Sequence, residues 1–186
     1  MVSLGELWLP ILVSAVLLFL VSAIIHMVLK YHNKDYKPLP NEEAVRAALR
    51  SGNPAPAQYV IPYCPDMKEM EKPENKQKYA EGPVAVMNLM SPGVPNMGRY
   101  LTQWFIFLLL VSLFIAYITA HSIPRGAEYL HVFRVVGAIG FLAYAATHIQ
   151  DSIWWGKPWR NTWKDVVDGL VYGLVTAGVF GWLWPR

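Results

Sequence analysis

The chain has 186 residues, of which 54% are hydrophobic and 16% are charged, and its formal net charge is +3. This composition argues against a freely soluble enzyme. The single cysteine, Cys64, excludes a secreted domain held together by disulfides. The small net charge gives no reason to expect a nucleic-acid partner. The charges gather between Lys30 and Arg99 and leave long apolar stretches on both sides. The sequence therefore predicts a polytopic membrane protein.

The first apolar stretch runs from about Leu7 to Leu29. At 1.5 Å per residue a helix over it would be roughly 35 Å long, enough to cross the hydrocarbon core of a bilayer. We interpret this stretch as a retained anchor because Glu6 is the only charged side chain before it, whereas a cleaved signal peptide has a basic start.

The charged segment 30–99 is too long to be a simple connection and should contain local structure. Asn41, followed by two glutamates, predicts the N-cap of a short amphipathic helix that ends near Gly52. Asp66 and Glu69 have the spacing of a capping box and predict a second helical segment. Two apolar runs predict short strands, at 58–61 and 84–89.

This segment contains too few large apolar residues to hold a core by itself. We therefore expect it to pack against its own helices or against a partner protein. The side chains expected to make that contact are Val45, Leu49, Tyr59, Val60 and Ile61.

Three more apolar stretches follow, at about Tyr100–Thr119, Tyr129–Ile149 and Val166–Trp184. Each is long enough for a tilted crossing. The predicted fold is an all-α membrane protein with four transmembrane helices and a mixed loop of short helices and strands between the first two. The expected parts of the chain are the first span at 1–29, the loop subdomain at 30–99 and three further spans at 100–186.

The basic residues predict the orientation of the spans. Thirteen Lys and Arg residues fall in segments 30–99 and 150–165, whereas only Arg125 and Arg186 fall on the opposite side. Because cytoplasmic loops carry an excess of Lys and Arg, both segments should be cytoplasmic and both termini periplasmic.

Four histidines lie in or near the predicted spans, where a polar side chain is costly. The topology pairs His26 with His148 at the cytoplasmic side and His121 with His131 at the outer side. Paired axial imidazoles would hold haem b in a four-helix cytochrome, although His131 and His148 differ by about 100° around their helix. The alternative is interfacial histidines that bond to backbone, lipid headgroups or neighbours. No other metal site is expected.

Small residues at four-residue spacing, Gly169, Gly173 and Ala177, lie along the fourth span. Such stripes let helices approach closely in lipid. The neighbour is either another span of this chain or a partner.

Two charges fall inside spans, Arg134 in the third and Asp168 in the fourth. The topology separates them by most of the bilayer, so we expect no ion pair between them. Asp168 is expected at a helix N-terminus beside Asp165. No nucleophile, phosphate-binding or metalloprotease motif is present, so no catalytic residue is expected.

Characteristic runs occur along the whole chain, among them LWLPILVSA, YHNKDYKPLPNEEAV, PDMKEM, GPVAV, PNMG, FRVVG, DSIWWGKPW, DGLVYG and FGWLWP. In these runs the chain resembles a widespread group of small four-span bacterial inner-membrane proteins to which no activity is assigned. The resemblance implies the topology and a bacterial inner membrane, and it carries no catalytic residues.

These observations favour a non-catalytic accessory subunit of a larger bacterial membrane complex, such as a photosynthetic reaction centre with its antenna or a respiratory complex. Its partners would be larger integral membrane subunits and the lipid bilayer. No cofactor is required in this hypothesis, and lipids or pigments would be contacted through a partner. The alternative is a small b-type cytochrome that uses the paired histidines.

Overall fold

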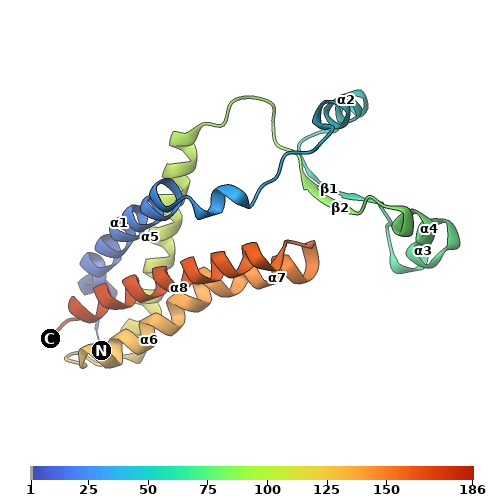
Figure 1. The fold of residues 1–186 in the computed structure, drawn as a ribbon. Coiled ribbons are helices and arrows are strands. Elements are labelled where there is room, and N and C mark those ends of the chain that lie inside the picture. Colours follow the sequence, from blue (N-terminus) through green and yellow to red (C-terminus); the bar gives the residue numbers. More distant parts are fainter. Residues whose placement is uncertain (1) are drawn as a thin grey trace. The chain divides into compact units, whose positions relative to one another are not determined.

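The computed structural model describes residues 2–186, and 71% of the chain is helical. Four helices are long and apolar enough to cross a membrane, and a two-stranded sheet is the only sheet among the described residues. This confirms the expected helical class with four membrane-length helices (Figure 1). The chain divides into two compact units, one reaching up to Tyr36 and resuming at Asn96–Arg186, the other comprising Lys37–Pro95.

The first membrane-length helix runs continuously over Leu4–Leu29. Its start is capped because the backbone N–H of Ser3 donates to Oε2 of Glu6 over 2.9 Å. It ends at Lys30, which adopts a left-handed conformation with φ 53°. Its successive parts are η1 (Leu4–Leu7), α1 (Trp8–Ala23) and the π-helical η2 (Ile24–Leu29).

The second and third helices are joined by a short connection at 123–128. The side chain of Asn96 starts the second helix by accepting from the backbone N–H of Arg99 over 3.0 Å. The third helix changes winding in its middle, where a π-helical segment replaces the regular hydrogen bonds. The elements are α5 (Met97–Ser122), α6 (Tyr129–Phe141), the π-helical η4 (Leu142–Ala146) and α7 (Thr147–Trp155).

The fourth helix, α8 (Trp159–Trp182), begins well before the predicted Val166. Pro158 precedes it, and its first turns are polar, so hydropathy alone predicts only its later, apolar part. The expectation that Asp168 lies at a helix N-terminus is therefore wrong. Asp168 lies in the interior of α8 and is only 5% exposed.

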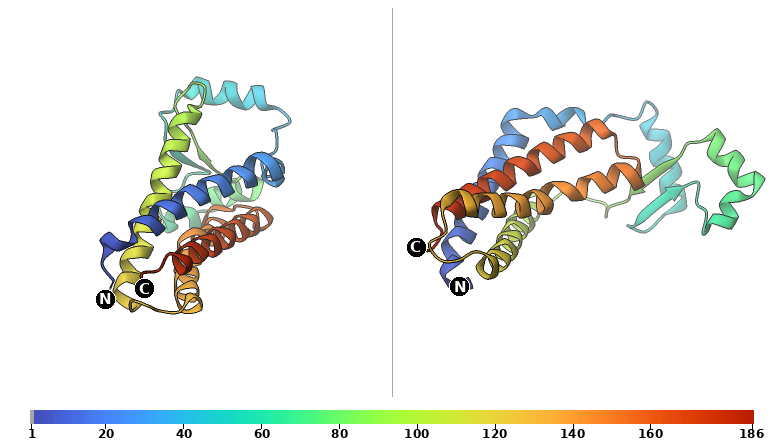
Figure 2. Two further views of the ribbon diagram at one scale, coloured as in Figure 1. Left: turned by 90° about the vertical axis from the view of Figure 1, so that its left-hand side faces the viewer. Right: turned by 90° about the horizontal axis from the view of Figure 1, so that it is seen from below.

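α8 packs closely along the third helix, and Figures 1 and 2 show the two side by side. A Cβ added to Gly173 would lie 2.9 Å from the backbone nitrogen of Phe141, and one added to Gly169 would lie 2.7 Å from Cα of Ala145. Only glycine permits this approach. The stripe of small residues therefore meets another span of the same chain.

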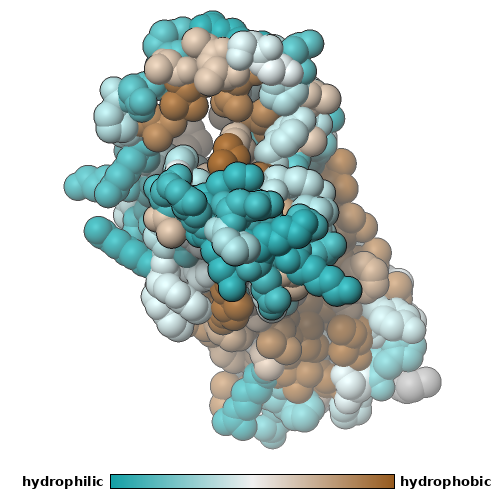
Figure 3. Space-filling model, turned by 90° about the vertical axis from the view of Figure 1, so that its right-hand side faces the viewer, coloured by the Kyte–Doolittle hydropathy of each residue, from teal (hydrophilic) through white to brown (hydrophobic). Residues whose placement is uncertain are grey.

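The interior of the bundle is filled by large apolar side chains from all four spans. Its outer surface is also apolar, as expected for helices that face lipid. On the part of this surface that is visible in Figure 3, brown, hydrophobic side chains are common. Fully buried apolar residues include Leu7, Leu18, Leu108, Ile115, Val132, Val136 and Phe180.

Both ends of the chain lie at one end of the bundle, as Figure 2 shows. Arg125, between the second and third helices, forms an ion pair with Glu6. The indole Nε1 of Trp184 donates to the carbonyl oxygen of Pro124 over 3.0 Å. Four membrane crossings would require this arrangement, because an even number returns the chain to the side on which it began.

The unit Lys37–Pro95 is built from short elements. Its two strands pair antiparallel, with Tyr59 opposite Met87 and Val60 opposite Val86. No residue of this unit is buried. Its elements are α2 (Glu42–Gly52), β1 (Gln58–Ile61), α3 (Met67–Glu71), α4 (Pro73–Glu81) and β2 (Ala85–Asn88).

Candidate functional site

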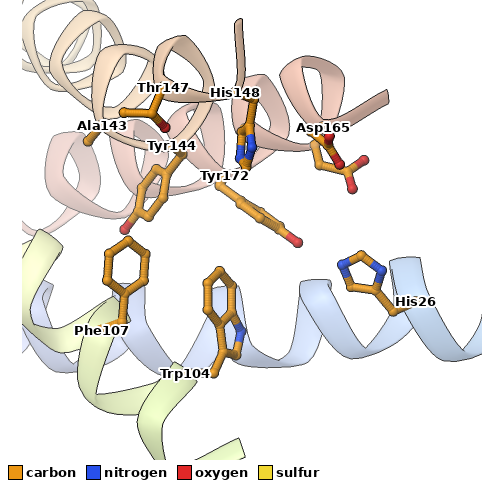
Figure 4. A pocket seen from close by; sticks show the side chains of 11 residues that line it. His26, Trp104, Phe107, Ala143, Tyr144, Thr147, His148, Asp165 and Tyr172 are labelled. Carbon is orange, nitrogen blue, oxygen red and sulfur yellow. The ribbon is translucent and has the colours of Figure 1, made fainter. Parts of the chain in front are cut away.

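A cavity of about 270 Å³ opens between the four membrane-length helices, in the half of the bundle remote from the two termini. Every span contributes to its wall. Figure 4 shows side chains from the first and second helices facing those of the third and fourth across it. The lining residues are His26, Trp104, Phe107, Ala143, Tyr144, Thr147, His148, Asp165, Asp168, Gly169 and Tyr172.

Both π-helical segments border this cavity. His26 belongs to η2, and Tyr144 belongs to η4. A π-helical turn inserts an extra residue into a helix and re-aims the side chains around it, and such turns are frequent at functional sites. Their occurrence on two different walls of one cavity marks it as the leading candidate site.

Four aromatic side chains, Trp104, Phe107, Tyr144 and Tyr172, lie in the cavity wall. The ring centroids of Trp104 and Tyr172 are 6.2 Å apart, and those of Tyr144 and Tyr172 are 5.8 Å apart in an edge-to-face arrangement. Phe107 stacks on Trp104 at 5.5 Å. The indole Nε1 of Trp104 donates to Oγ of Ser22 over 3.0 Å, which holds that ring in place.

Two of these aromatic residues carry hydroxyl groups with unmet hydrogen bonds. Tyr144 and Tyr172 are each 5% exposed, and within residues 2–186 neither hydroxyl has a hydrogen-bond partner. A buried polar group without a partner is costly. Its presence in a cavity wall indicates a place where a bound molecule supplies the missing partner.

A polar cluster adjoins the cavity where the first helix ends. The hydroxyl of Tyr31 donates to Oδ1 of Asp168. Nε2 of His32 lies 2.9 Å from Oδ2 of Asp168, and its Nδ1 lies 2.7 Å from Oδ2 of Asp35. A neutral imidazole has only one N–H, so it can donate a hydrogen bond to only one of the two carboxylates. For both of these contacts of His32 to be hydrogen bonds, the cluster must hold one more proton. The cluster is a place where a proton can be held.

Lys164 of α8 completes this cluster. Its Nζ donates to Oδ1 of Asp35 and, over 2.8 Å, to the carbonyl oxygen of Tyr31. Burial alone raises the pKa of the Asp35 carboxyl, but the hydrogen bonds from Lys164 and His32 outweigh it and hold that pKa below its ordinary value. The segment after the first helix is thereby fixed against α8.

The second carboxylate of the cavity wall is also paired. Nζ of Lys157 lies 2.6 Å from Oδ2 of Asp165, and the side chain of Asp165 is 21% exposed. Asp168 is held by Tyr31 and His32. Neither carboxylate is therefore left to attract a free cation into the cavity.

The structure brings together one of the two predicted histidine pairs. His26 and His148 line the same cavity, and neither makes a side-chain hydrogen bond within the described residues. His121 is exposed and its Nδ1 lies 2.7 Å from the carbonyl oxygen of Tyr117 in its own helix. His131 is exposed and lines neither of the two described cavities.

The remaining predicted residues lie elsewhere. Gly169 lines the cavity, while Gly173 and Ala177 continue its stripe toward α6. Residues 2–186 contain no group of three His, Cys, Asp or Glu residues suited to a metal ion. The expected contact residues all belong to the unit Lys37–Pro95, where Val45, Leu49 and Tyr59 are half-buried and Val60 and Ile61 are exposed.

Sequence reasoning missed the polar cluster and the tyrosines. Tyr31, His32 and Asp35 follow directly after an apolar span, and Asp168 and Tyr172 are four residues apart on one helix face. The concentration of polar side chains after the first span was a usable signal. The distance in sequence between that segment and α8 hid the contact.

Comparisons with protein-family models, with curated proteins and with solved structures found no match.

Proposed function

We propose that this protein is a non-catalytic accessory subunit of a larger bacterial membrane complex, such as a photosynthetic reaction centre with its antenna or a respiratory complex. The observation that carries the proposal is the unit Lys37–Pro95, in which no residue is buried. A segment of this size gains little stability without burying apolar surface. A neighbouring subunit would supply the missing contact.

The apolar side chains of this unit support docking. Tyr63, Met67 and Met90 are 73%, 68% and 74% exposed, and Val94 is 95% exposed. Exposed apolar side chains in a unit without a buried core suit contact with another chain. The β1–β2 pair adds exposed strand edges, which are themselves suited to contact with another chain.

The charge distribution supports the orientation within a bacterial inner membrane. Segments 30–99 and 150–165 carry thirteen basic residues and would be cytoplasmic, and both termini would be periplasmic. The partner would then be a larger integral membrane subunit with a cytoplasmic face. Lipids or pigments would be contacted through that subunit.

Native purification tests this function. The tagged protein, extracted in mild detergent, should co-elute with larger membrane subunits that mass spectrometry identifies. Val60→Asp should abolish this co-elution, because it places a charge on an exposed apolar position of β1. Gln58→Asp is the matched control, since it lies on the same face of the same strand and is already polar. Retention of every partner by Val60→Asp would contradict docking through this strand.

Limited proteolysis provides a second readout. Lys68 and Lys78 lie in the short helices α3 and α4 and are exposed. Trypsin should cut between them much faster in the isolated subunit than in the native complex. Equal protection in both preparations would mean that the chain holds this unit without a partner.

A b-type cytochrome is the second candidate function. The observation that favours it is that His26 and His148 line one cavity. Figure 4 shows the side chain of Tyr172 projecting into the space between their two helices, so a haem held by both would require Tyr172 to move. An absorption spectrum of the reduced protein tests this function. A sharp α-band that His26→Ala removes and His121→Ala leaves intact would support it.

A further inference from the structure

The wall of the cavity selects for a flat ligand. Trp104, Tyr144 and Tyr172 present ring faces and edges toward a space of about 270 Å³. This volume lies just below the usual range for small-molecule pockets, so it suits a single substituted ring better than a large macrocycle. Aromatic walls favour offset-stacked or edge-to-face contact with such a ring.

The tyrosine hydroxyls without partners favour a ligand that carries hydrogen-bond acceptors. The hydroxyls of Tyr144 and Tyr172 are free to donate, because neither has a partner within residues 2–186. His26 and His148 provide further nitrogen atoms at the same cavity. Figure 4 shows these donors on different sides of the space, so a ligand with oxygen acceptors at two positions on its ring would meet more than one of them.

The charges select for a neutral molecule. An anion would find no Lys or Arg among the residues that line the cavity. A cation would find no free carboxylate, because Lys157 pairs with Asp165, and Tyr31 and His32 hold Asp168. The ligand that fits is uncharged and carries its polarity as hydrogen-bond acceptors.

The position of the cavity selects for a lipophilic molecule. It lies between helices whose outer surfaces are apolar and long enough to cross a membrane. A ligand that reaches it from the bilayer must dissolve in hydrocarbon. These four requirements are a flat ring, two acceptor oxygens, no charge and an apolar character.

We propose that this cavity binds the head group of a lipophilic quinone, with a ring carbonyl accepting a hydrogen bond from the hydroxyl of Tyr172 or Tyr144. The ring packs against Trp104, and the apolar tail of the quinone extends toward the lipid. The assignment goes beyond the accessory-subunit function, because it concerns binding by this chain alone.

Equilibrium binding to the full chain in phospholipid nanodiscs tests the proposal. The probe is decylubiquinone labelled with ¹³C at its carbonyl carbons, and infrared difference spectra report both occupancy and hydrogen bonding. We expect saturable binding and a carbonyl stretch shifted to lower frequency. Tyr172→Phe should weaken binding by about five- to tenfold, the range that one hydrogen bond of this kind contributes.

The matched control is Tyr117→Phe. Tyr117 lies in α5 and is 55% exposed, so its hydroxyl does not face the cavity. This variant should bind the probe as the wild type does. Tyr144→Phe provides a second cavity variant if Tyr172→Phe does not fold.

Three results would overturn the proposal. The first is an absence of saturable binding by the wild type, and the second is equal affinity in the wild type and both cavity variants. The third is displacement of the probe by tetramethylammonium, which would identify the cavity as an aromatic cage for a cation. Co-elution with membrane subunits is a separate measurement. If the chain binds the quinone but co-elutes with no partner, this proposal holds and the proposed function fails. If it has a partner but does not bind the quinone, the proposed function holds and this proposal fails.

Discussion

The two units of the chain stabilise their structures in different ways. The membrane bundle buries side chains completely, for example Leu18 and Leu108, whereas the unit Lys37–Pro95 buries none. One ion pair from each unit differs in the same sense. Lys164 and Asp35 are 19% and 10% exposed in the bundle, but Arg46 and Glu43 are 57% and 69% exposed in α2. The bundle can hold a defined site by itself, while the other unit needs a neighbour.

The largest expected effect tests the close packing of the bundle. Gly173→Leu should prevent α8 from approaching the third helix, because even a Cβ at this position would lie 2.9 Å from the backbone nitrogen of Phe141. The protein should fail to accumulate in membranes, and Gly173→Ala should have a lower melting temperature.

Gly178→Ala is the control for this packing. The nearest atom to its added Cβ is the hydroxyl oxygen of Tyr129, at 3.8 Å, which is ordinary contact. It should accumulate and melt as the wild type does. Normal accumulation of Gly173→Leu would show that α8 does not depend on this contact.

The second prediction compares one ion pair from each unit. Lys164→Ala should cost about 2 kcal/mol of bundle stability, because it leaves the poorly exposed carboxylate of Asp35 with His32 as its remaining side-chain partner. Arg46→Ala should cost less than about 0.5 kcal/mol, because its partner Glu43 remains solvated. Chemical denaturation of both variants in detergent measures the difference. Equal losses of stability in the two variants would contradict the expectation that the bundle pair contributes more than the pair in α2.

The third prediction concerns tyrosine hydroxyls. Without ligand, Tyr172→Phe should leave the bundle as stable as before or more stable by about 1 kcal/mol, because it removes a buried hydroxyl that has no partner. Tyr79→Phe in α4 should instead lose a little stability, since its hydroxyl donates to the carbonyl oxygen of Pro62 over 3.0 Å. The melting temperature should stay the same or rise for Tyr172→Phe and fall for Tyr79→Phe. A clear destabilisation by Tyr172→Phe would mean that its hydroxyl is already satisfied.

The smallest expected effect is a pH dependence from Asp35. Its pKa is lowered in the folded protein, so it adds stability that is complete above its ordinary value of 3.8 and is lost as the pH falls through the folded pKa. The difference in melting temperature between the wild type and Asp35→Asn should therefore be constant near neutral pH and shrink in acid. If the difference in melting temperature grew as the pH fell, the pKa of Asp35 would be raised in the folded protein, contrary to this prediction.

Several features of the candidate site followed from the order of residues alone. His26 and His148 could be paired because span order assigns them to the same end of the bundle, and the cavity contains both. Tyr172 could not be assigned to that cavity in advance, because the rotation of α8 about its axis depends on which neighbours its glycines contact. The stripe of small residues was recognisable, but its neighbour was not.

The sequence by itself determined the number and approximate extent of the membrane-length helices, since hydrophobicity and helix caps such as Asn96 act over a few residues. Tertiary structure alone decided the surroundings of Asp168. Tyr31 and His32 reach it from more than 130 residues away, because the first helix ends beside α8 and Lys164 fixes the following segment there. Contacts between distant segments depend on how the helices pack, and that packing is a property of the whole bundle.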